Sequence, residues 1–134
     1  MFDLFIQCYT KKFLQFEGRS GRKEYISFIL FYSLIGLALS TISRVSGIDI
    51  YIVSYLFLFI QIISFLPILN LTTRRLHDIG YSGFIQLVLI PIVLLVKSHQ
   101  YINFGIISGL AFCILVLFYK GTGEPNKYGD PPEY

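Results

Sequence analysis

Charged side chains are scarce in this sequence: they make up 14% of the residues, against about 25% in an average soluble domain. Tryptophan is absent, and hydrophobic residues make up 54% of the chain. The mean hydropathy is high, at +0.66. This composition excludes an ordinary soluble domain and predicts a membrane protein, in which helices pack against one another within lipid.

Cysteine is nearly absent as well, with only Cys8 and Cys113 in the chain. Cys8 precedes the first long apolar stretch and Cys113 lies inside the last one, so we expect the two sulfur atoms to be far apart. The sequence therefore predicts two free thiols and no structural disulfide.

Four long stretches of the chain carry no charge. A transmembrane helix needs about 20 apolar residues, and the stretches at 25–43, 50–71, 80–96 and 101–119 meet or approach that length. We predict an all-α integral membrane protein, a single domain of residues 1–134 built as a small bundle of four transmembrane helices with a polar tail at 120–134. The third helix is short, so the alternative is one crossing with a re-entrant segment.

The segment before the first stretch has a helical pattern of its own. Its apolar residues recur every three or four positions through residues 1–17, at Phe2, Phe5, Ile6, Tyr9, Phe13 and Phe16. This periodicity predicts an amphipathic helix. Such a helix lies either on the inner membrane surface, as an interfacial helix, or beneath the bundle as a packing element.

Lysine and arginine are unevenly divided between the two sides of the predicted bundle. Nine of them fall on the side that holds both termini, whereas only Arg44 and Lys97 fall on the other. Because positively charged loops stay in the cytoplasm, we expect the N-terminus and the C-terminus to be cytoplasmic. The positive charges do not cluster into a basic surface, so nucleic acid is not an expected partner.

The most polar part of the chain is TRRLHDIGYSG at 73–83. If the second helix continues past Pro67, its polar residues form one stripe at helical spacing, and Gly80 ends the helix. The stripe consists of Asn70, Thr73, Arg74, His77 and Asp78. Arg74 and Arg75 lie four and three residues before Asp78, so both can pair with its carboxylate.

This stripe lacks the partners that catalysis or metal binding would need. A base such as His77 beside Asp78 needs a nucleophile or a second carboxylate pair, and neither is near in the sequence. His99, the other histidine, is predicted on the opposite membrane face. We therefore predict no catalytic residue, no metal and no cofactor, and a hydrogen-bonding role in the structure for His77.

A second motif, GRSGRKEY at 18–25, leads into the first long helix. Its arginines, Arg19 and Arg22, either clamp phosphate groups of lipids or anchor the topology. If this motif meets the central stretch at the cytoplasmic interface, Asp78 can pair with Arg19 or Arg22. Glu24 can then pair with Arg74 or Arg75.

A third motif, GTGEPNKYGDP, follows at 121–131. With these three motifs in this order, the chain resembles the bacterial inner-membrane family catalogued as domain of unknown function 805. The resemblance implies a small multi-pass inner-membrane protein with no established activity. Where relatives usually have tryptophan, this chain has Ile26 and Phe84. The candidate positions that the resemblance carries over are Gly18, Arg19, Arg22, Glu24, Tyr25, Arg74, Arg75, Leu76, His77, Asp78, Ser82, Gly83, Asn126, Tyr128 and Gly129.

Two hypotheses for the function follow. In the first, the protein is a non-enzymatic membrane module whose cytoplasmic face binds a partner protein or anionic lipid headgroups. In the second, it is a small carrier or a membrane-embedded enzyme with a polar pocket around Asn70 to Asp78. Only Gln61 and Asn70 are strongly polar within a predicted span, which argues against the second.

Besides the lipid bilayer, the expected partners are another membrane protein or further copies of this chain. Gly105, Gly109 and Cys113 recur every four residues in the fourth stretch. Small residues at this spacing let two helix backbones approach closely. The neighbouring helix belongs either to the same chain or to a homo-oligomer.

Overall fold

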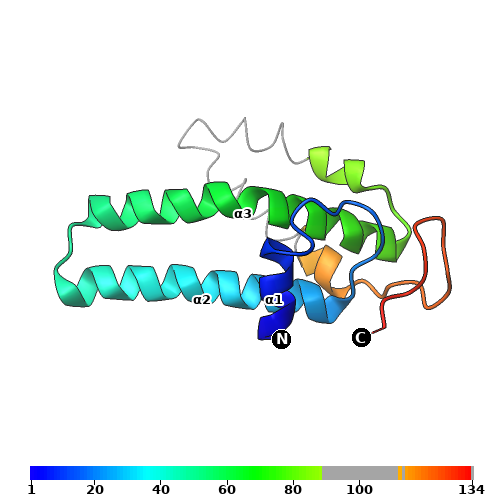
Figure 1. The fold of residues 1–134 in the computed structure, drawn as a ribbon, viewed down its shortest axis with the longest axis horizontal. Helices are drawn as coiled ribbons and strands as arrows, with labels where there is room; N and C mark the ends of the chain where they lie inside the picture. The colour runs from blue at the N-terminus through cyan, green and yellow to red at the C-terminus, as the bar shows by residue number, and fades with distance from the viewer. Residues whose placement is uncertain (89–111, 113, 134) are drawn as a thin grey trace. The chain divides into compact units, whose positions relative to one another are not determined.

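The computed structural model describes residues 1–88, 112 and 114–133 (Figure 1). Within these residues the regular elements are helical, and an isolated bridge pairs Asn126 with Gly129. The helices are α1 (Phe2–Tyr9), α2 (Arg22–Ser46), α3 (Ile50–Ile79) and the 3-10 helix η1 (Gly83–Val88). Residues 114–118 are also helical. The predicted all-α class is confirmed for this part of the chain.

The first two predicted spans form the long helices α2, with 25 residues, and α3, with 30 residues. Among the described residues these two are long and apolar enough to cross a bilayer, with mean hydropathies of 1.9 and 2.3 over their most apolar windows. Gly47, at φ 67°, follows the end of α2. Asp49 then caps α3, because its carboxylate accepts a hydrogen bond of 2.8 Å from the backbone nitrogen of Tyr51.

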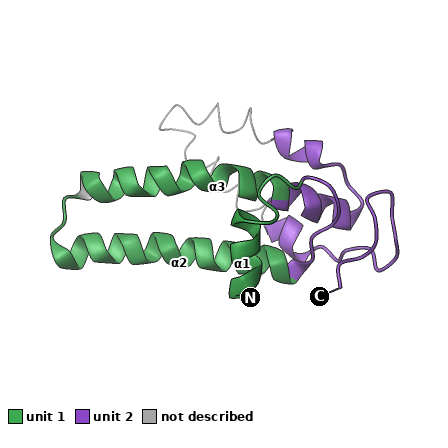
Figure 2. Cartoon of the chain, viewed as in Figure 1, with its two compact units in different colours: residues 1–15, 23–70 green, residues 16–22, 71–134 purple. Residues whose placement is uncertain are grey.

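The chain divides into two compact units (Figure 2). Unit 1 consists of residues 1–15 and 23–70, and unit 2 of residues 16–22 and 71–134. α3 supplies residues to both units, because the helix continues through Pro67 and ends only at Ile79. The sequence left open whether this helix continues beyond the proline, and the structure shows that it does.

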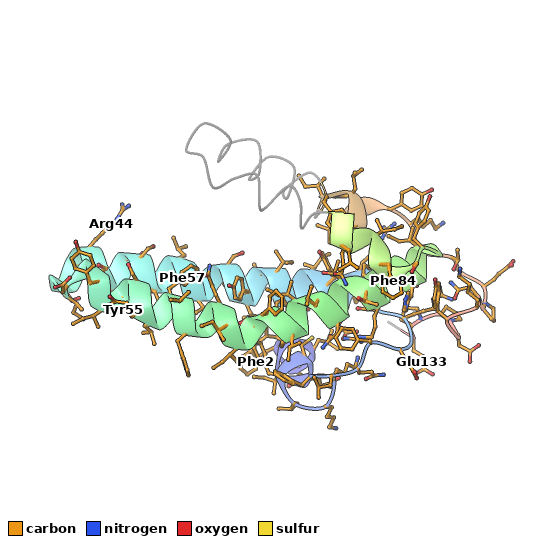
Figure 3. The ribbon with its side chains drawn as sticks, turned by 90° about the horizontal axis from the view of Figure 1, so that it is seen from above. Phe2, Arg44, Tyr55, Phe57, Phe84 and Glu133 are labelled. Atoms are coloured by element: carbon orange, nitrogen blue, oxygen red, sulfur yellow. The ribbon has the colours of Figure 1, made fainter. Side chains whose placement is uncertain are left out.

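In unit 1, α2 and the first part of α3 run side by side in opposite directions (Figures 1 and 3). A Cβ atom on Gly36 of α2 would lie 3.4 Å from the ring of Phe57 on α3, so the small residue brings the helices close. α1 packs on α2 through aromatic rings, with Phe5 and Phe28 centred 5.6 Å apart. Tyr9 also shares a hydrogen bond of 2.6 Å with Ser64 of α3.

α1 is shorter than its sequence pattern predicts. The periodicity predicted a helix over residues 1–17, but α1 ends at Tyr9 and the chain then turns. The side-chain amide of Asn70 donates hydrogen bonds to the carbonyls of Lys12 and Phe13, at 2.9 and 2.6 Å. These contacts hold the backbone in a non-helical path, so a distant side chain overrides the local preference of the sequence.

The third predicted span differs from the structure at its start. Residues 80–82 are not helical, and η1 begins at Gly83. Gly80 adopts φ 95°, which terminates α3, and Ser82 then accepts hydrogen bonds at the start of η1. The rest of this span, most of the span at 101–119, His99 and the small residues Gly105, Gly109 and Cys113 lie outside the described residues. Cys8 is in the thiol form, as predicted, and its Sγ donates a hydrogen bond of 3.3 Å to Leu4 O.

Candidate functional site

The site is built in unit 2 around the last two turns of α3. These turns end in a Schellman motif, in which Tyr81 N bonds to Leu76 O at 2.9 Å and Gly80 N to His77 O at 3.0 Å. The motif satisfies carbonyls that the helix end would otherwise leave without partners. It also holds His77 and Asp78 at a rigid helix terminus.

Asp78 is the centre of a buried charge network, with 4% of its surface exposed. Its Oδ1 accepts hydrogen bonds from Arg19 Nε and Nη2, at 3.1 and 2.8 Å. Its Oδ2 accepts one from Arg75 Nη1, and its backbone carbonyl accepts one from Thr122 N at 2.9 Å. The predicted pair of Asp78 with Arg75 is confirmed, and the structure selects Arg19 as its partner in the first motif.

The remaining N–H groups of Arg19 donate to residues 122–129, which follow the helical residues 114–118. Nη1 donates to the carbonyls of Glu124 and Gly129, at 2.8 and 3.3 Å, and Nη2 donates to the carbonyl and, at 3.1 Å, the hydroxyl of Thr122. Arg19 is itself buried, with 8% of its surface exposed. Together with the bonds to Asp78, these contacts give each nitrogen of the Arg19 guanidinium a protein partner.

Arg75 likewise donates hydrogen bonds to backbone carbonyls, here at the end of the helical residues 114–118. Its Nε donates to Val116 O at 3.0 Å and its Nη2 to Tyr119 O at 2.6 Å. A guanidinium placed there also complements the negative end of the helix dipole. Beside it, the backbone carbonyl of Arg74 accepts a hydrogen bond of 3.0 Å from Ser20 N, which joins the first motif to α3.

His77 contacts the first and the third motif. Its Nδ1 lies 3.1 Å from Gly18 O, and since a carbonyl can only accept, Nδ1 is the protonated nitrogen. Its ring stacks on that of Tyr128, with centroids 3.8 Å apart and an interplanar angle of 4°. The hydrogen-bonding role predicted for His77 is confirmed.

Asn126 fixes the loop that carries Tyr128. Its side chain donates to the backbone carbonyl of His77 at 3.0 Å and accepts from Tyr128 N at 2.8 Å. Gly129 follows with φ 118°, a conformation that side chains other than that of glycine rarely adopt. Residues of all three motifs are therefore brought together in unit 2.

A small hollow lies beside the stacked rings. It has a volume of about 230 Å³ and is lined by Glu17, Gly18, His77, Lys127 and Tyr128. Lys127 Nζ lies 4.9 Å from the centre of the Tyr128 ring. Among the described residues nothing hydrogen-bonds to Nε2 of His77, which in the neutral ring carries the free lone pair.

The other predicted positions have separate environments. Arg22 is exposed, and its Nη2 donates to Phe118 O at 3.2 Å. Glu24 belongs to unit 1, where its carboxylate accepts a hydrogen bond of 3.1 Å from Lys12 Nζ. Its predicted pairing with Arg74 or Arg75 stays a prediction. Gly83 packs on Thr73, because a Cβ there would lie 3.0 Å from its Oγ1.

Two residues of the network were not among the predicted positions. Thr122 binds both Arg19 and Asp78, and Gly121 packs directly against the Asp78 carboxylate. The signal in the sequence is the GTG that opens the third motif. In the parts of the chain that the structure describes, no group of three His, Cys, Asp or Glu residues is placed to hold a metal ion.

Two helices long and apolar enough to cross a membrane, one of which ends in a buried charge network, are features expected of a helical membrane protein. The chain belongs to the family described as Protein of unknown function (DUF805), whose profile matches residues 13–130 and so includes all three motifs. It is therefore an inner-membrane protein of this family, as predicted.

Curated relatives support this assignment. The chain is 30% identical over 127 residues to the protein named Inner membrane protein YhaI of Escherichia coli strain K12, an alignment that covers 92% of this chain and 91% of the relative. The protein of the same name from Escherichia coli O157:H7 matches equally well. No solved structure matches the chain significantly.

Proposed function

We propose that the protein is a non-enzymatic inner-membrane module that binds anionic lipid headgroups at the cytoplasmic face through Arg22 and Lys120. The carrying observation is the contrast between the two arginines of the first motif. Arg19 is buried and bonded, whereas Arg22 is exposed, and within the described residues its guanidinium donates to a single carbonyl, that of Phe118. The remaining donors of Arg22 are available to phosphate oxygens.

Lys120 strengthens this proposal by its position. It is exposed and lies two residues after Phe118, whose carbonyl accepts from Arg22, so a second cation follows the helical residues 114–118. The ends of apolar helices lie where headgroups begin, and each cation near an anionic surface contributes about 1 kcal/mol to binding. Exposed Lys23, next to Arg22 in the sequence, adds to the local positive charge.

The non-enzymatic part of the proposal rests on how the charged groups are used. Both oxygens of Asp78 accept hydrogen bonds from arginines, so the carboxylate is not available as a general base. Arg19 and Arg75 hold backbone carbonyls as well. Groups engaged in this way form a rigid frame for a binding surface.

For the membrane arrangement we propose four spans with both termini in the cytoplasm, supported by the nine lysines and arginines on one side against two on the other. A reporter that is active only in the cytoplasm, fused after Tyr134, is then expected to be active in intact cells. The same fusion placed after Gly47, in the connection that follows α2, is expected to be silent. Activity after Tyr134 from a periplasmic reporter instead would reduce the third and fourth stretches to one crossing.

Lipid binding can be tested with a matched pair of variants at the two ends of α2. Native mass spectrometry of the full-length protein, released from micelles that hold an anionic and a zwitterionic phospholipid with the same acyl chains, counts the retained lipids. Arg22→Gln and Lys120→Gln are each expected to lower the preference for the anionic lipid about fivefold, the equivalent of one surface cation. Exposed Arg44 lies in the last turn of α2, so Arg44→Gln serves as the control.

The outcomes separate the hypotheses. If Arg22→Gln and Arg44→Gln lowered the preference for the anionic lipid equally, any surface cation would have the same effect. The proposed lipid site would then be wrong. A wild-type protein with no preference for the anionic lipid would favour a partner protein at this face. The carrier or enzyme alternative keeps one supporting observation, the hollow lined by His77, Lys127 and Glu17.

A further inference from the structure

α3 carries two side-chain amides within its apolar run, and their environments differ. Asn70 is fully buried, and its amide nitrogen donates to the carbonyls of Lys12 and Phe13. Gln61 is exposed on the surface of α3. Its amide makes no hydrogen bond to any residue that the structure describes.

Gln61 also lies near the middle of its span. It is 12 residues after Asp49 and 13 residues before Arg74, the charged residues that bound the run. At about 1.5 Å per residue these separations are roughly 18 and 20 Å, so the amide lies close to the centre of a hydrocarbon core about 30 Å thick. Water is scarce at this depth, and an amide without a partner there is costly.

Among the residues that the structure describes, the surroundings of Gln61 are apolar and open. With Ile62 and Phe65 it lines a hollow of about 370 Å³ on the surface of α3. Both neighbours are largely exposed, at 65% and 60%, and so is Leu58 on the preceding turn, at 51%. This face therefore combines lipid-exposed packing surface with one group that requires a hydrogen-bonding partner.

We propose that this face of α3 is a homodimer interface in which Gln61 hydrogen-bonds to Gln61 of a second copy. A primary amide is self-complementary, because it has both a donor and an acceptor, so two of them form a reciprocal pair. Copies of one chain insert in the same orientation, which places their Gln61 residues at the same depth. A twofold axis along the membrane normal then brings the same face of both copies together.

The test measures energy transfer between donor-labelled and acceptor-labelled copies of the full-length protein in bilayers, as a function of the protein-to-lipid ratio. Wild type is expected to dimerise. Gln61→Met keeps the size of the side chain but removes the amide, and it is expected to weaken the dimer about tenfold, since each of two interhelical hydrogen bonds contributes about threefold. Gln61→Asn retains an amide and is expected to dimerise more strongly than Gln61→Met.

Ile63→Met is the matched control. Ile63 lies two residues further along α3, about 200° around the helix axis, and should not alter energy transfer. Helix content by circular dichroism checks that Gln61→Met folds, which is expected because the change removes a polar group from lipid. Energy transfer equal to that of wild type in Gln61→Met, or no transfer in wild type at the highest protein-to-lipid ratio, would overturn the proposal.

Discussion

Replacement of Asp78 by alanine is expected to lower the free energy of unfolding by about 3–5 kcal/mol, the range for removing one partner of a buried ion pair. Both carboxylate oxygens are engaged by arginines, and the residue is 4% exposed. Its loss leaves the positive charges of Arg19 and Arg75 buried without their common anion. Asp78→Asn keeps the shape and one acceptor, so it is expected to be less damaging than Asp78→Ala.

Denaturant-induced unfolding in detergent micelles, followed by circular dichroism, would measure the loss. Double-mutant cycles then show whether the arginines are energetically coupled to Asp78 or act as independent topology anchors. Asp78→Ala combined with Arg19→Ala or Arg75→Ala is expected to be less damaging than the sum of the single changes, with coupling of about 0.5–3 kcal/mol. Arg22 donates to Phe118 O and serves as the control arginine, for which additivity is expected. Additivity for Arg19 and Arg75 as well would contradict a shared network.

The sequence predicted much of this network because few charges interrupt its apolar stretches. In a membrane protein an isolated acid has few partners, so the spacing of Arg74 and Arg75 before Asp78 indicated both as partners on the same helix, and the structure pairs Arg75 with Asp78. The long helices were predictable for the same reason, since uncharged stretches of sufficient length have few alternatives to a helix in lipid. Gly80 marked the end of α3 in the sequence, and the structure confirms it.

Other features depend on contacts between residues far apart in the sequence. Arg19 and Arg22 have the same charge and lie three residues apart, and nothing in the sequence tells which of them reaches Asp78. The end of α1 is set by Asn70, 58 residues beyond Lys12, and local periodicity contains no trace of this contact. The role of Thr122 was hidden because its contact with Arg19 uses the backbone carbonyl as well as the side chain.

The two glycines of the GTG sequence differ sharply in their surroundings, although they are only two residues apart. A Cβ added to Gly121 would lie 2.6 Å from Cγ of Asp78, closer than such atoms approach, and 3.0 Å from its Oδ1. A Cβ added to Gly123 would meet nothing within 4 Å. Neither glycine has a positive φ, so the backbone conformation itself tolerates alanine at both positions.

Gly121→Ala is therefore expected to lower the free energy of unfolding by about 1–3 kcal/mol, the usual cost of overpacking. Asp78 cannot move away cheaply, because hydrogen bonds from Arg19 and Arg75 hold both of its oxygens. Gly123→Ala is expected to be neutral or to stabilise by up to about 1 kcal/mol, through the entropy of the unfolded chain. Thermal unfolding of both variants in the same detergent makes the comparison.

In the Asp78→Ala background the methyl group that Gly121→Ala adds has room, so this substitution should then cost little. An undiminished cost there would show that Gly121 is needed for another reason than its contact with this carboxylate.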